Sequence, residues 1–215
     1  MSRWIDTTII HVKQVLSNAE AGHDWFHIER VYRNAMHIAQ TIECNVTVVQ
    51  LAALLHDIAD SKFHEGDESI GPLKAKEWME SIAVDATVIN HVVKIIQNIS
   101  FKGGNISQDF NSVELQIVQD ADRLDAIGAI GIARAFHYGG FKNRLLYDPN
   151  VAPIMNMDKE TYKKSTAPTI NHFYEKLLLL KNRMNTPTGK AMAEKRHAFM
   201  EQFLSHFYAE WEGGE

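Results

Sequence analysis

The sequence predicts an all-α protein, folded as a compact helical bundle. Apolar residues recur at the three- and four-residue spacing of a buried helix face, as Val88, Ile89, Val92, Val93 and Ile96 do. No segment of useful length shows the alternation of apolar and polar residues that marks a half-buried β-strand. The chain has 215 residues, of which 45% are hydrophobic and 23% charged, so it can bury a sizeable core. We therefore expect helices packed on helices.

Turn and capping residues divide the chain into its expected helices. Asp24 is the expected N-cap of the second helix, and Asn45 or Thr47 that of the third, because such side chains accept hydrogen bonds from a helix's first turn. A polar loop at 60–68 and a long irregular loop at 138–157 are expected between helices, and long ordered loops are often functional. The expected helices cover residues 4–19, 25–43, 47–57, 69–82, 85–99, 112–136, 168–184 and 188–211.

Composition excludes several classes of protein. The net charge of −5 argues against bulk electrostatic binding to nucleic acid. A single cysteine, Cys44, cannot form an internal disulfide or a cysteine-based zinc site. No apolar run approaches the ~20 residues that span a bilayer, and the first residues lack the apolar segment of a signal peptide, so a cytoplasmic location is expected. Without a linker or an internal repeat, residues 1–215 are expected to form one domain, with the helices at 168–211 packed on the rest.

The third predicted helix ends in residues that can bind a metal ion. The apolar run Leu51–Leu55 leads directly into His56 and Asp57. An imidazole nitrogen and a carboxylate oxygen together suit Mn²⁺, Fe²⁺, Zn²⁺ or Mg²⁺. The partial negative charge at a helix C-terminus also favours a cation. One His-Asp pair occurs by chance in many chains, so further ligands are required.

Two other helices offer candidate ligands. His27 shares a helix face with Val31 and Asn34, whereas His23 lies just before the expected start of that helix. On the helix at 112–136, Asp122 and Asp125 fall within about 60° of each other on an apolar stripe, and Asp120 lies roughly 160° from Asp122. Carboxylates in that setting need a cation or a basic partner. Capping or pairing with an arginine remains an alternative to metal binding for both residues.

The order His27, His56-Asp57, Asp122 resembles the HD-domain superfamily of metal-dependent phosphohydrolases, whose pattern is H…HD…D on a helical bundle. The segments His23–Val31, Leu55–Asp60 and Asp120–Ala126 each resemble one of its three motifs, and the motifs lie within residues 20–140. The resemblance implies that His27, His56, Asp57 and Asp122 bind one divalent metal ion: Mn, Mg, Fe, Co or Ni. The remainder of the chain is similar to a bacterial subfamily of nucleotide-hydrolysing HD proteins.

The resemblance also suggests roles for residues beside the motifs. Asp60 follows the His-Asp pair where related guanosine tetraphosphate hydrolases carry an acidic pair that acts on the attacking water, but the second residue here is Ser61. Asp60 is therefore either the general base or a loop cap. Basic side chains near the motifs are candidates to hold phosphate groups, although each also fits a surface charge or an ion pair. The substrate-binding candidates are His23, Arg30, Lys62, Arg123, Lys142 and Arg144.

The expected activity is hydrolysis of a nucleoside triphosphate to the monophosphate and pyrophosphate. A nucleotide phosphomonoesterase and a non-catalytic metal- or nucleotide-sensing module are the alternatives. A two-metal oxidative enzyme would need more histidines between the second and third motifs than His64 and His91, and packing explains His91. The expected partner is a small phosphorylated molecule, with a homodimer as a further option, and neither nucleic acid nor a membrane is expected.

Overall fold

The computed structural model describes residues 3–17, 24–59, 67, 69–99, 110–157, 161 and 165–214. Within these residues the regular structure is entirely helical, which confirms the predicted all-α class. His23, Asp60, Lys62 and His64 lie outside the described residues. None of the described helices combines the length and the apolar character required to cross a membrane.

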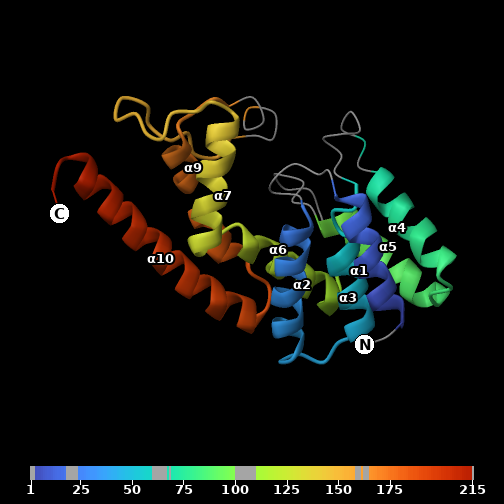
Figure 1. The fold of residues 1–215 in the computed structure, drawn as a ribbon. Coiled ribbons are helices and arrows are strands. Elements are labelled where there is room, and N and C mark those ends of the chain that lie inside the picture. Colours follow the sequence, from blue (N-terminus) through green and yellow to red (C-terminus); the bar gives the residue numbers. More distant parts are fainter. Residues whose placement is uncertain are drawn as a thin grey trace. The chain divides into compact units, whose positions relative to one another are not determined.

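The chain forms two compact units, and α6 runs from one into the other (Figure 1). The first unit contains α1 to α5 and α6 as far as Asp122. The bounds are Arg3–Val15 for α1, Trp25–Ala39 for α2, Val46–Leu55 for α3, Ile70–Ser81 for α4, Ala86–Ile99 for α5 and Val113–Asp125 for α6. The expectation that residues 1–215 make one domain stays a prediction.

Helix α3 lies at the centre of the first unit and contacts α1, α2 and α5. Val48, Val49 and every residue from Leu51 to Leu55 are buried, as expected of a helix that is hydrophobic on all sides. Its N-cap is Asn45, whose side chain accepts a hydrogen bond from the Val48 amide at 3.2 Å. Asp24 caps α2 in the same way, through the His27 amide at 3.0 Å. Both caps were among those predicted, and they fix where the helices carrying the histidines begin.

The single helix predicted at 112–136 is wrong, because the chain forms two helices there. Helix α6 ends at Asp125 and α7 spans Gly128–Phe141. Gly128, the first residue of α7, has a φ of 76°, a left-handed conformation that glycine adopts without steric cost and that does not fit a helix continuing from α6. The prediction of an irregular segment beginning at 138 is also corrected, since α7 continues to Phe141.

The second unit contains the last residues of α6 together with α7, α9, η2 and α10. The helix expected at 168–184 is divided into α9 (Thr169–Glu175) and the 3₁₀ helix η2 (Leu177–Arg183), separated at Lys176. Helix α10 (Pro187–Trp211) packs on α7 and η2. An aromatic cluster joins α7, α9 and α10, with ring centroids 5.8–6.5 Å apart among Phe136, Phe173, Phe203 and Phe207.

Candidate metal centre

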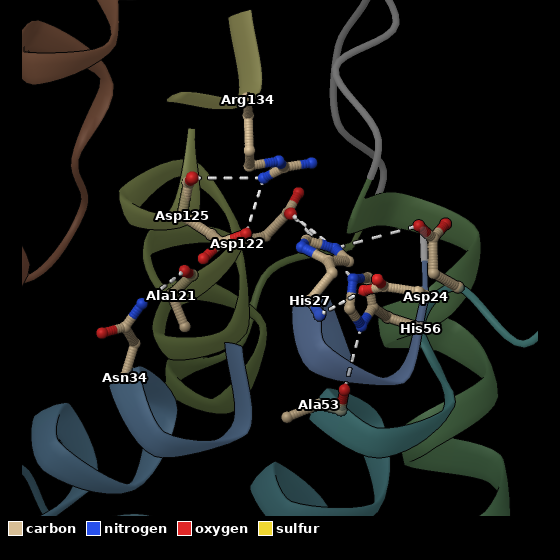
Figure 2. Close-up of polar contacts among 10 residues, drawn as sticks. Asp24, His27, Asn34, Ala53, His56, Ala121, Asp122, Asp125 and Arg134 are labelled. Atoms are coloured by element: carbon tan, nitrogen blue, oxygen red, sulfur yellow. Dashed lines mark hydrogen bonds and ion pairs between the residues drawn. The ribbon is translucent and has the colours of Figure 1, made fainter. Parts of the chain in front are cut away.

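The first unit brings together the four residues predicted as metal ligands, of which Figure 2 labels His27, His56 and Asp122. His27 Nε2 lies 3.6 Å from Asp122 Oδ1 and 3.9 Å from Asp57 Oδ2. His56 Nε2 lies 3.9 Å from the same Asp122 oxygen. Donor atoms of His27, His56 and Asp57 all fall within 4.8 Å of one another. Residues separated by up to 95 positions in sequence thus converge on one point.

Each of the four side chains lies at the end of a helix or on its face. His27 is in the first turn of α2, directly above its Asp24 cap. His56 is the C-cap of α3, and Asp57 follows in a turn closed by the hydrogen bond from the Ile58 amide to the Leu55 carbonyl at 3.2 Å. Asp122 is on α6, one turn before that helix ends. The two histidines are nearly inaccessible, with 3% and 4% of their side-chain surfaces exposed.

The hydrogen bonding of His56 fixes its tautomer. His56 Nδ1 lies 2.9 Å from the Ala53 carbonyl oxygen, and since a carbonyl only accepts, Nδ1 carries the proton (Figure 2). In the neutral ring, Nε2 then holds a bare lone pair. Among the described residues this buried nitrogen has no hydrogen-bond partner, and buried polar atoms are rarely left so. A nitrogen lone pair oriented by a backbone carbonyl behind it fits a metal ligand.

The carboxylates occupy the open side of this cluster. Asp57 has 24% of its side-chain surface exposed and Asp122 has 41%. Two imidazole nitrogens and two carboxylate oxygens form a mixed donor set that suits a divalent cation of the Mn²⁺ or Fe²⁺ type. The histidines are buried and the carboxylates are partly exposed. A cation held between them would therefore be open to an anionic ligand on the side of the carboxylates. The chemistry of the donor set therefore fits the metal that the sequence predicted.

The aspartates of α6 differ from the prediction in their surroundings. Asp122 was expected on an apolar stripe, which is wrong, because it is the most exposed of the four clustered side chains. Asp120 is instead fully buried. Asp125 is also buried and forms an ion pair with Arg134 at 2.6 Å, the arginine-paired alternative left open by the sequence. The helical wheel separated Asp120 from Asp122 correctly, but it misjudged which side of α6 faces the core.

Several predicted substrate-binding residues lie in the second unit, where they already have partners. Arg123 donates a hydrogen bond from Nη1 to the Arg183 carbonyl, and Arg144 donates from Nη2 to the Ser165 carbonyl at 2.6 Å. The Lys142 ammonium lies 5.0 Å from the centroid of the Phe141 ring. A guanidinium has five N–H donors, so such backbone contacts leave others for a phosphate. The substrate-binding roles of these residues, and of half-buried Arg30 in the first unit, stay predictions.

Two residues that support the site were given no role by the sequence. Ala53 supplies the carbonyl that orients His56, and Asn34 donates a hydrogen bond to the carbonyl of Ala121, beside Asp122. Only sequence spacing could have indicated these two roles. Ala53 precedes His56 by three residues, and Asn34 follows His27 by about two helical turns. His91, for which packing is the expected role, makes polar contacts instead: its Nε2 lies 3.0 Å from Ser112 Oγ and 3.5 Å from Glu114 Oε2.

Comparison with known proteins identifies relatives of this chain in sequence and in structure. The model of the HD domain matches residues 25–127, a range that includes all four clustered residues. YpgQ of Bacillus subtilis is 36% identical over 194 residues, which are 90% of this chain and 86% of YpgQ. The crystal structure of an HD-superfamily hydrolase from Bacillus thuringiensis is 43% identical, covers 97% of this chain and 96% of its own, and superposes with a TM-score of 0.77.

The crystal structure of Bacillus subtilis YpgQ in complex with ADP superposes equally well. Its TM-score is 0.77, with 32% identity over 97% of this chain and 95% of that one. YpgQ and the two crystal structures thus each align with at least 90% of this chain. The matched domain includes the His/Asp cluster, whose donors suit a divalent cation. The chain therefore belongs to the HD-domain family and is a hydrolase of the HD superfamily.

Proposed function

We propose that the protein is a metal-dependent nucleotide hydrolase that converts nucleoside triphosphates to monophosphates and pyrophosphate. The observation that carries the proposal is the pair of buried histidines facing two partly exposed carboxylates, with no hydrogen-bond partner for His56 Nε2 among the described residues. A divalent cation bound there would polarise a phosphoryl oxygen and lower the pKa of a water ligand. His27, His56, Asp57 and Asp122 are the residues proposed to hold it.

The chain's own residues define what the site accepts. Among the described residues of the cluster, the histidines are buried and Asp57 and Asp122 are partly exposed, so a substrate is proposed to approach past the two carboxylates. These carboxylates would repel a phosphate unless a cation neutralises them, which makes phosphate binding dependent on the metal. Asp60, three residues beyond Asp57, is proposed as the general base, and His23 and Lys62 are proposed to contact the substrate.

A nucleotide is the favoured substrate class because a relative of this chain has been crystallised with one. The YpgQ complex contains ADP, and that protein aligns with 97% of this chain. A nucleotide offers a polyphosphate that binds a divalent cation and a leaving group that carries its own charge. The proposed cleavage between the α- and β-phosphorus atoms adds one water and releases pyrophosphate.

Product analysis tests the reaction. The protein with Mn²⁺, Mg²⁺ or Co²⁺ is incubated with each nucleoside triphosphate, and the products are followed by ³¹P NMR. Pyrophosphate is the expected product, formed in equal amount to the monophosphate. Orthophosphate as the sole inorganic product would instead identify a phosphomonoesterase. Absence of hydrolysis with every nucleotide and metal would leave metal or nucleotide sensing as the function.

The loop after α7 gives a prediction about substrate affinity. Lys142→Ala should raise KM severalfold and change kcat little, because a charge that binds the distal phosphates acts on the ground state and the transition state alike. Lys190→Ala, which removes another exposed charge, from α10, is the matched control. Steady-state kinetics at saturating metal separate the two constants. An unchanged KM for Lys142→Ala would remove this residue from the substrate-binding set.

A further inference from the structure

Asn34 connects the helix that carries His27 to the helix that carries Asp122. Its side-chain amide nitrogen donates a hydrogen bond to the Ala121 carbonyl oxygen at 3.3 Å, and Figure 2 shows this contact beside the metal cluster. Ala121 immediately precedes Asp122 and has no exposed surface. Residues 34 and 121 are 87 positions apart, so this hydrogen bond is a tertiary contact and not part of either helix.

Asn34 and His27 lie on the same face of α2. They are seven residues apart, which is about two turns, or roughly 10 Å along the helix axis. That face therefore approaches α6 at two points. At one, His27 Nε2 lies 3.6 Å from the Asp122 carboxylate, and at the other Asn34 is bonded to the backbone of the preceding residue.

The Asn34 hydrogen bond restrains α6 where the metal site needs it. A hydrogen bond to the carbonyl next to Asp122 limits both sliding of α6 along α2 and rotation of α6 about its own axis. Either motion would shift the Asp122 carboxylate relative to His27. Metal ligands that are held in place bind an ion without the cost of first being ordered, and residues behind the ligands influence affinity for this reason.

We propose that Asn34 is a positioning residue, which sets the register of α6 on α2 and thereby holds Asp122 in place for the metal. The proposal rests on the metal site of the proposed function. In this role Asn34 acts through the Ala121 backbone and is not itself a ligand.

The test compares Mn²⁺ affinity among variants of the full chain by isothermal titration calorimetry. Asn34→Leu keeps the side-chain size and removes the donor, and it should weaken Mn²⁺ binding by about tenfold, the lower end of the effect of losing an outer-shell partner. Asn34→Gln retains the amide donor and should recover part of that affinity. The control is Thr8→Val, which removes the acceptor for the Trp78 indole at 3.0 Å, a bond between α1 and α4 that involves no proposed ligand.

Stability is measured in parallel, as the Tm of each metal-free variant. The expected result is a loss of affinity in Asn34→Leu that exceeds any change in Thr8→Val, even where the two variants lose similar stability. If Asn34→Leu binds Mn²⁺ as tightly as the original protein, or if Thr8→Val weakens binding equally, the positioning role is refuted. If the original protein itself binds no Mn²⁺, the metal site of the proposed function fails instead.

Discussion

Replacing Asp57 with alanine should abolish metal binding and reduce hydrolysis at least a thousandfold, while the helices stay folded. A bound cation supplies several kcal/mol of transition-state stabilisation, and each ~1.4 kcal/mol corresponds to a factor of ten in rate. Asp57 lies beyond the end of α3, in a turn, and 24% of its side-chain surface is exposed. Its loss therefore leaves no large cavity in the core formed by α3.

Elemental analysis of the purified variant, with activity and circular dichroism, measures all three expectations. Glu80→Ala is the control, because it also removes one negative charge, at an exposed position on α4. Glu80→Ala should bind metal and hydrolyse nucleotides as the original protein does. Full metal occupancy in Asp57→Ala would exclude this residue as a ligand, and an unfolded variant would assign it a structural role.

The positions of His27, His56 and Asp57 at helix ends were predictable because local sequence marks them. Asp24 caps the helix of His27, and an entirely apolar helix ends at His56 and Asp57. These features depend on residues within a few positions of each other. Local sequence therefore predicted which residues could donate to a metal and which helices carry them, whereas the set of four ligands followed from the resemblance to the HD domain.

Features that depend on distant partners were not predictable in the same way. The wheel for 112–136 assumed one straight helix, whereas Gly128 takes a positive φ and the Arg134 guanidinium donates to the Asp125 carbonyl at 3.1 Å. The wheel also had no information about which side of α6 the rest of the chain covers, and so it placed Asp122 in an apolar setting. The backbone partner of Arg144 is likewise set by tertiary structure, since Ser165 lies 21 residues away.

Asp122 and Asp120, two residues apart on α6, should respond to substitution in opposite ways. Asp122→Asn should lower Mn²⁺ affinity and hydrolysis by roughly a hundredfold or more, because it removes a charged ligand and metal sites depend strongly on ligand charge. With 41% of its side chain exposed, Asp122 contributes little to the core, so the Tm of the metal-free protein should change little. Asn keeps the size of the side chain, which confines the change to charge and hydrogen bonding.

Asp120→Asn should have the reverse profile. Asp120 is fully buried, and altering a buried polar group that is held by partners costs about 1–3 kcal/mol of unfolding free energy. Its carboxylate lies roughly 160° around the helix from that of Asp122, so metal binding should persist in whatever fraction of the variant is folded. Chemical denaturation and Mn²⁺ titration of both variants measure the two effects separately. Loss of metal from Asp120→Asn, with retention in Asp122→Asn, would mean that the carboxylate near His27 and His56 is not the one that completes the site.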